Sequence, residues 1–132
     1  MPTRLQALLG IAHPVIQAPM AGVQGSALAL AVSNAGALGS LPAAMLTPQV
    51  LRAELQTLRS GTQRPFNVNF FCHTPPVPDV TREAAWRVAL APFYAEAGLD
   101  NTVVPAGAGR VPFTAEAADL LEAFRPAVVS FH

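Results

Sequence analysis

Charge, lysine, cysteine and histidine are all scarce in this sequence. The 132 residues include no lysine, three histidines and one cysteine, Cys72, and only 12% of them are charged. One cysteine excludes an internal disulfide, and so few thiols and imidazoles offer no zinc-ligand spacing, so we expect no metal site. Eight arginines balance eight acidic residues. Without a net basic field, neither nucleic acid nor an anionic membrane surface is an expected partner.

Long hydrophobic runs are absent as well. The longest apolar runs have about eight residues, whereas a membrane-spanning helix needs about 20. The segment before His13 lacks the apolar stretch of a secretory signal. We therefore expect a soluble, cytoplasmic protein.

Apolar residues, in contrast, are abundant and make up 52% of the chain. A self-contained domain of this length usually covers its surface with more charge than this chain carries. The composition therefore favours a part of a larger protein, or one face of an oligomer.

Four short apolar runs are expected to form strands. They are residues 15–19, 38–41, 66–70 and 127–131. The runs are continuous rather than alternating, as in strands that are covered on both faces. Each gap leaves room for a crossover helix, so the strands are expected to be parallel and the fold to be α/β.

Helix signals lie in the gaps between these runs. Ser26 is expected to cap a helix over residues 27–34, and Thr47 with Pro48 begins a second helix. We expect a third helix over residues 81–98, and a fourth that runs from a Thr114 cap to residue 124. The loop between these two is expected to hold a short strand at 103–104 and a turn at 107–109. In the second helix, three leucines at helical spacing predict a buried stripe: Leu51, Leu55 and Leu58.

Four parallel strands are half the number in an eight-stranded barrel, which takes about 250 residues. An open doubly wound sheet is the other closure that this pattern allows. A last strand without a covering helix favours the barrel. We therefore expect residues 1–132 to be the N-terminal half of a (β/α)8 barrel of the TIM type.

Ligands of parallel α/β folds bind at the carboxyl ends of the strands. Asn69, at the end of one strand, could hydrogen-bond the edge of a ligand ring through its donor and acceptor atoms. Alternatively, it could be a polar strand end whose hydrogen bonds come from a neighbouring loop. His132 could be a base or a charge stabiliser, or simply a loop histidine. Small residues after Met20 could form a flat surface for a planar ring, or only pack the loop. Cys72 and His73 point opposite ways in an extended chain, so we expect no nucleophile–base pair from them.

Three stretches together resemble the nitronate monooxygenases of the bacterial type, formerly called 2-nitropropane dioxygenases. They are residues 14–20 with 31–40, residues 64–73, and residues 125–132. The resemblance implies a flavin-binding barrel that uses FMN and molecular oxygen to oxidise alkyl nitronates, such as propionate 3-nitronate, to a carbonyl compound and nitrite.

The resemblance also implies roles for individual residues. Asn69 would hydrogen-bond the flavin, and His132 would be a catalytic residue near the flavin and the substrate. One loop would line the isoalloxazine ring through Ala18, Pro19, Met20, Ala21 and Gly22. The family's FMN phosphate loops and base histidine would lie downstream, so we expect an N-terminal part of the enzyme that is inactive by itself.

Two other interpretations stay open. One is a related flavin-barrel enoyl-acyl-carrier-protein reductase that uses NADH. The other is a non-catalytic half-barrel that works only by pairing, either with a second copy of itself or with a separate C-terminal half.

Overall fold

The structure, a computed structural model, describes residues 1–103 and 109–132 in two units. The first unit comprises residues 1–73 and 109–132, and the second is the segment Thr74–Ala108. Two expected features extend beyond the residues that the structure describes. They are the strand at residues 103–104 and the turn at residues 107–109.

The first unit is built on a parallel sheet in the order β1-β2-β3. Its strands are β1 (Gly39–Pro42), β2 (Phe66–Phe70) and β3 (Val128–Phe131). In the register, Ser40 lies beside Asn67, and Asn69 lies beside Ser130. Three of the four expected strands are therefore confirmed, and so is the parallel α/β class.

The run expected to form the first strand is a single bridge instead. Ile16 pairs with Leu38 in parallel, and backbone bonds on each side join Gln17 N–H to Leu38 and Leu38 N–H to Val15. Val15 and Ile16 are 54% and 50% exposed. The expected buried strand at 15–19 is therefore wrong, because the chain leaves the ladder after Gln17 and none of the described residues covers its outer side.

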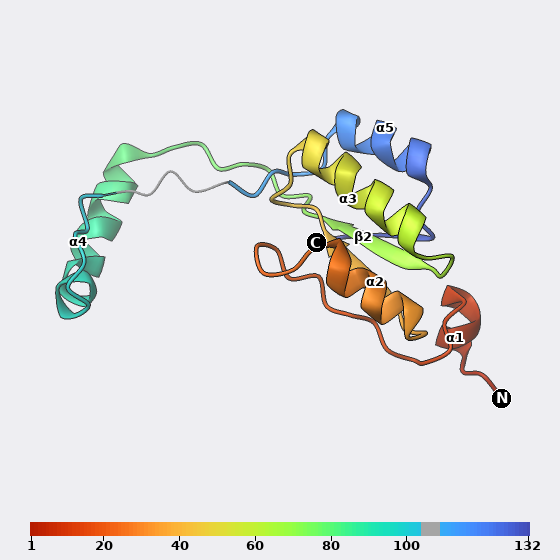
Figure 1. The fold of residues 1–132 in the computed structure, drawn as a ribbon. Helices are drawn as coiled ribbons and strands as arrows, with labels where there is room; N and C mark the ends of the chain where they lie inside the picture. Colours follow the sequence, from red (N-terminus) through yellow and green to blue (C-terminus); the bar gives the residue numbers. More distant parts are fainter. Residues whose placement is uncertain (104–108) are drawn as a thin grey trace. The chain divides into compact units, whose positions relative to one another are not determined.

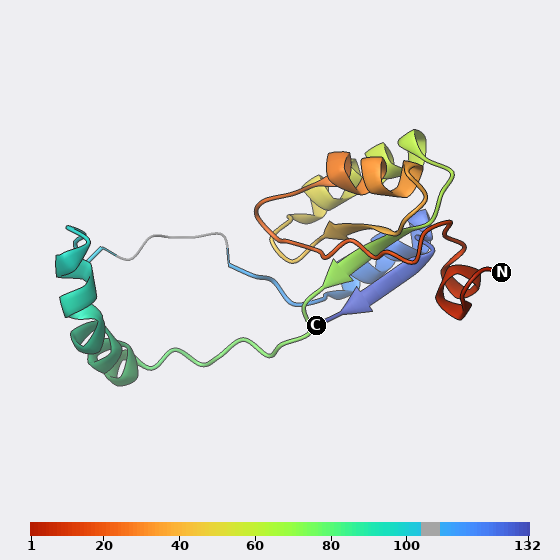
Figure 2. The ribbon, with the colours of Figure 1, turned by 90° about the horizontal axis from the view of Figure 1, so that it is seen from below.

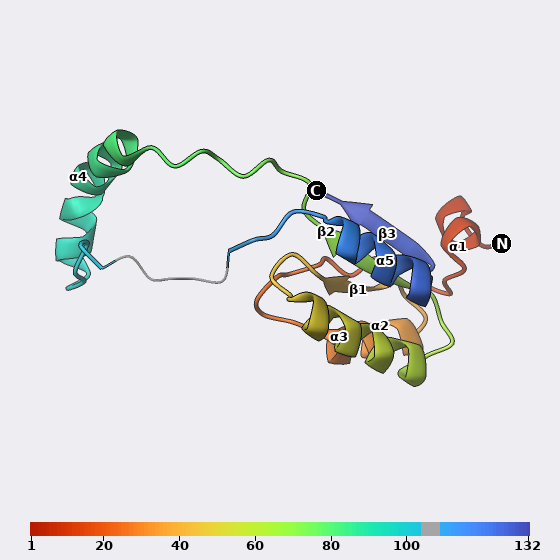
Figure 3. The same cartoon turned by 90° about the horizontal axis from the view of Figure 1, so that it is seen from above.

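Helices cover one face of this sheet (Figures 1 and 3). They are α2 (Ser26–Asn34), α3 (Pro48–Gly61) and α5 (Ala115–Phe124). The opposite face, seen from below in Figure 2, is not covered by any helix that the structure describes in this unit. One-sided covering is what a sector of a barrel requires, because the other face of the sheet lines the barrel interior.

The core lies between the sheet and these helices. The expected leucine stripe of α3 is buried there, with Leu55 and Leu58 fully enclosed. Alternate residues of β2 face this stripe: Phe66, Val68 and Phe70. Because side chains alternate along a strand, Asn67 and Asn69 must face the side without helices.

The helix starts follow the sequence at two of the three expected caps. The hydroxyl of Thr47 accepts a hydrogen bond from Val50 N–H, and that of Thr114 accepts one from Ala117 N–H. Ser26 is not a cap: it is the first residue of α2 and is buried. Its backbone N–H donates instead to the Glu54 carboxylate at 2.6 Å.

A helix that the periodicity did not predict, α1 (Arg4–Leu9), opens the chain. Thr3 and Gln6 form a reciprocal capping box at its start, and Gly10 ends it with a left-handed φ of 65°. The Thr-x-x-Gln spacing was the available sequence signal.

The second unit holds α4 (Val80–Glu96), close to the helix expected over 81–98. The Asp79 carboxylate caps it by accepting bonds from the backbone of Thr81 and Arg82, each at 3.0 Å. Pro92 lies inside the helix, and none of its residues is buried. Across residues 1–103 and 109–132, no helix combines the length and apolarity that a bilayer crossing requires.

Candidate functional site

The carboxyl ends of the three strands meet at one edge of the sheet. Backbone hydrogen bonds continue beyond the strands there. The Ala43 N–H donates to the backbone carbonyl of Asn69 at 2.8 Å, and the His132 N–H donates to the backbone carbonyl of Phe70 at 3.0 Å. The Cys72 N–H in turn donates to the backbone carbonyl of His132 at 2.9 Å. The structure thus brings Asn69 and His132 to the same edge, as the sequence predicts.

Asn69 is 7% exposed and belongs to a polar network on the face without helices. Its side-chain Nδ2 donates to the Ser130 hydroxyl at 2.9 Å and to the Ser130 carbonyl at 3.3 Å. Nδ2 of Asn67 donates to the same hydroxyl at 2.9 Å and to the hydroxyl of Ser40 at 3.2 Å. Four side chains on three strands are thereby tied together.

One atom of this network lacks a partner. Oδ1 of Asn67 is sealed from solvent and accepts no hydrogen bond from the described residues. A buried acceptor without a donor costs about 1–3 kcal/mol, so such atoms are rare in folded proteins. Because the described residues already enclose this oxygen, it is an unsatisfied point inside the network and not a contact for a ligand on this face.

The loop after the bridge is anchored to β1 by two glutamines. Gln17 Oε1 accepts from Ser40 N–H at 3.1 Å, and Gln17 Nε2 donates to the Ser40 carbonyl at 3.3 Å. Gln24 Nε2 donates to the same carbonyl at 3.2 Å and to that of Ala18 at 3.1 Å. These bonds hold the start and end of the loop at the carboxyl edge of β1.

Within this loop the residues expected to line a ring are small or partly exposed. Met20 is 47% exposed, and Gly22 has a φ of 85°, which favours glycine. Pro19 and Ala21 are half-buried, and Ala18 is exposed. Among the described residues, no hydrogen bond joins this loop directly to Asn69 or His132, so the loop and these side chains share the edge without bonding each other.

His132 is exposed, and its ring lies against Phe71 with 5.6 Å between ring centroids. Two other groups contact the same phenyl ring: the His73 imidazole at 6.1 Å and the Arg110 guanidinium at 5.8 Å. Sequence reasoning missed Arg110, because nothing in its local pattern links it to β2. Cys72 is an exposed free thiol. The edge thus gathers two imidazoles and a guanidinium that could attract an anion.

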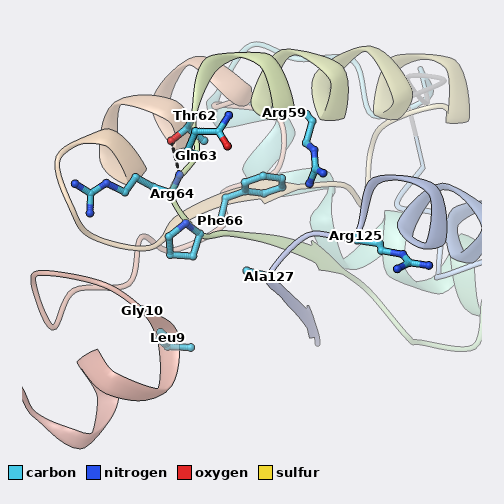
Figure 4. A pocket seen from close by; sticks show the side chains of 10 residues that line it. Leu9, Gly10, Arg59, Thr62, Gln63, Arg64, Phe66, Arg125 and Ala127 are labelled. Carbon is cyan, nitrogen blue, oxygen red and sulfur yellow. Dashed lines mark hydrogen bonds between the residues drawn. The ribbon is translucent and has the colours of Figure 1, made fainter.

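A cavity of about 600 Å³ lies at the other end of the strands, beside Phe66 and Ala127 (Figure 4). Three arginines line it, and Figure 4 shows the side chains of Arg64 and Arg125 extending away from one another. None of the expected site residues lines this cavity. Since barrel enzymes bind substrates at the carboxyl ends of their strands, we take the opposite edge as the candidate site.

Comparison with known proteins decides the family. The family model for nitronate monooxygenase matches residues 2–132. The chain belongs to the nitronate monooxygenase family. The resemblance carried by residues 14–20, 31–40, 64–73 and 125–132 is therefore confirmed.

Individual nitronate monooxygenases and related structures agree with this assignment. The chain is 48% identical over 103 residues to a nitronate monooxygenase of Pseudomonas aeruginosa, covering 78% of this chain and 29% of that relative. It is similar to the nitroalkane oxidase of Streptomyces ansochromogenes, with a TM-score of 0.71, 34% identity, and coverage of 97% of this chain and 35% of the other. It is also similar to FabK from Thermotoga maritima, with a TM-score of 0.64, 25% identity, and coverage of 99% and 30%. The chain thus spans about a third of the length of these proteins.

Membership of the nitronate monooxygenase family agrees with the expected partial barrel, since the sheet and its one-sided helices correspond to about a third of longer enzymes. The expected roles of Asn69, His132 and the loop at 18–22 are predictions about ligand contact. Within the described part of the chain, no group of three histidine, cysteine or acidic residues is placed to hold a metal ion.

Proposed function

We infer that this chain supplies the flavin-facing part of an enzyme that oxidises alkyl nitronates with molecular oxygen to a carbonyl compound and nitrite. The observation that carries this function is the family match over residues 2–132 together with Asn69 and His132 at one carboxyl edge. The cofactor is FMN, the substrate is a small nitronate such as propionate 3-nitronate, and the setting is the cytoplasm.

The residues at the edge fit a flat heteroaromatic cofactor. An isoalloxazine carries an apolar ring face and a polar edge with both donors and acceptors. Small, partly exposed loop residues suit the ring face: Ala18, Pro19, Met20, Ala21 and Gly22. The carboxamide of Asn69 suits the polar edge, because its Oδ1 has no donor among the described residues.

When bound, FMN would supply the redox chemistry, accepting electrons from the nitronate and passing them to oxygen. The chain's own residues would orient the cofactor and stabilise the charge of the substrate. Asn69 would hold the ring edge, and the loop would exclude water from one ring face. A nitronate is an anion. His132 and the guanidinium of Arg110, which both lie against the Phe71 ring, would stabilise its negative charge.

The test replaces the corresponding N-terminal part of the Pseudomonas aeruginosa nitronate monooxygenase with residues 1–132, giving a full-length chimaera. We expect it to consume oxygen and release nitrite when given propionate 3-nitronate, and to oxidise NADH slowly. A folded chimaera that turns over NADH rapidly and leaves the nitronate unchanged would favour the reductase instead.

The pairing interpretation has its own measurement. Several apolar side chains of the first unit are at least half exposed, among them Leu8, Val15, Ile16 and Phe131. Exposed apolar side chains of this kind can mark a surface that another chain or segment covers. Light scattering on the purified 132-residue chain would give a dimer mass if pairing covers these side chains, and a stable monomer mass if pairing is not needed.

A further inference from the structure

The hydroxyl of Ser130 lies between two buried carboxamides. It accepts hydrogen bonds from Nδ2 of Asn67 and from Nδ2 of Asn69, each at 2.9 Å. We propose that Ser130 is a positioning residue that turns the Asn69 carboxamide so that its oxygen, and not its nitrogen, meets the cofactor. This role of Ser130 rests on the proposed flavin site.

The carbonyl and the hydroxyl of Ser130 together decide which way the Asn69 carboxamide faces. A carbonyl oxygen can only accept hydrogen bonds, so the group 3.3 Å from the Ser130 carbonyl must be the Nδ2 of Asn69. The Ser130 hydroxyl then binds the same nitrogen. With Nδ2 held on β3 by two bonds, Oδ1 is directed away from Ser130 and stays available to a ligand N–H.

Asn67 fixes the hydroxyl in turn. Its Nδ2 bridges Ser130 on β3 and Ser40 on β1, so the hydroxyl of Ser130 is held by a side chain that spans all three strands. Asn67 is 4% exposed and Ser40 is fully buried. In such a low-dielectric setting these bonds are strong, and a misplaced amide is costly. Asn69 is therefore oriented before any ligand arrives.

This arrangement predicts the kind of contact that Asn69 makes. An oxidised isoalloxazine has a single ring N–H, at N3, and several carbonyl and imine acceptors. A carboxamide presented by its oxygen would select the N–H edge, whereas one presented by its nitrogen would select the acceptors. Ser130 would thus set which edge of the ring is bound, although it touches only Asn69.

The experiment uses a pair of variants that differ by one group. Ser130→Thr keeps the hydroxyl, and Ser130→Val replaces it with a methyl group of similar size that also suits a strand. Exchange of the Asn69 side-chain amide hydrogens with water is followed by NMR on the 15N-labelled chain. We expect exchange in Ser130→Val to be at least about tenfold faster than in the wild type, and Ser130→Thr to stay near the wild type.

Ser40→Ala is the matched control, since Ser40 bonds Asn67 but not Asn69. It should speed exchange at Asn67 most strongly and change exchange at Asn69 much less than Ser130→Val does. If Ser130→Val leaves the Asn69 exchange rate unchanged, or Ser40→Ala alters Asn69 as strongly, the positioning role is overturned. If Ser130→Val does not fold, Ser130→Ala replaces it in the same comparison.

Titration with FMN separates this role from the proposed function. Where the wild type binds FMN, Ser130→Val should weaken binding about 3- to 10-fold relative to Ser130→Thr, and should have no further effect in an Asn69→Ala background. The titration uses the full-length chimaera that carries residues 1–132, and absence of FMN binding by the unsubstituted chimaera would count against the proposed flavin site. The exchange measurements would still decide whether Ser130 orients Asn69.

Discussion

The side chain of Gln17 binds the backbone of Ser40 through both of its polar atoms. Oε1 accepts from the Ser40 N–H at 3.1 Å, and Nε2 donates to the Ser40 carbonyl at 3.3 Å. A carboxamide therefore takes the place that a neighbouring strand residue would occupy. This explains how the chain can leave the ladder after one bridge and still keep the loop at 18–22 attached to β1.

Removing that side chain should loosen the loop and destabilise the fold. In Gln17→Ala, the fully buried Ser40 loses a partner for its N–H and one of the partners of its carbonyl. We expect a loss of about 1–3 kcal/mol in the free energy of unfolding, measured by urea denaturation. Gln49→Ala, at an exposed position on α3, should change stability by less than about 0.5 kcal/mol. Equal losses in both variants would contradict this role of Gln17.

Glu54 should stabilise the start of α2 from a neighbouring helix. Its carboxylate accepts from the Ser26 N–H at 2.6 Å, where the cap residue Gly25 offers no side chain. Both the hydrogen bond and the helix dipole favour a negative charge at this end. Glu54→Ala should therefore cost about 0.5–2 kcal/mol in thermal or chemical denaturation.

Glu122→Ala is the control for that loss, since Glu122 is an exposed acid whose side chain caps none of the described helices. A cost at Glu54 that is no greater than the cost at Glu122 would show that the carboxylate does not act as a cap.

Gly39 should not tolerate a side chain. A Cβ added there would overlap the carbonyl oxygen of Ala29 and lie 2.6 Å from Oγ of Ser33, both on α2. Because backbone cannot move aside cheaply, Gly39→Ala should lower stability by at least about 3 kcal/mol, or prevent folding. Gly109→Ala, with no atom of the described residues within 4 Å of the added carbon, should have little effect. Near-native stability of Gly39→Ala would mean that α2 does not pack this closely on β1.

Asn69 should matter for cofactor binding and much less for the core. In the full-length chimaera, Asn69→Ala should weaken FMN binding by about 1–3 kcal/mol, because a buried hydrogen-bond partner of the ring is lost. The measurement is a fluorescence titration of the apoprotein with FMN. An unchanged dissociation constant, with a native circular dichroism spectrum, would show that Asn69 does not bind the ring.

The sequence was most informative where local chemistry and periodicity agree. Thr47 followed by Pro48 marks a helix start with a hydroxyl cap, and the leucines of α3 repeat at helical spacing. The apolar run at residues 66–70 has the bounds of β2 itself. Such features depend on neighbouring residues only, so pattern reasoning can find them.

What the sequence did not reveal depends on contacts between distant residues. The short ladder at Ile16 follows from Gln17 reaching Ser40, and the start of α2 is satisfied by Glu54, 28 positions away. The hydroxyl of Ser130 joins Asn67 and Asn69 only after the strands are in register. The candidate positions Asn69 and His132 were accessible because parallel strands place their carboxyl ends together.

The most direct measurement is the flavin content of the purified chimaera that carries residues 1–132. The absorbance spectrum and the flavin released on denaturation give its identity and stoichiometry. We expect FMN at about one per chain, and a clear loss of it in Asn69→Ala. A folded chimaera that is colourless, or that retains FMN equally well without the Asn69 side chain, would contradict the assignment of this edge as the flavin site.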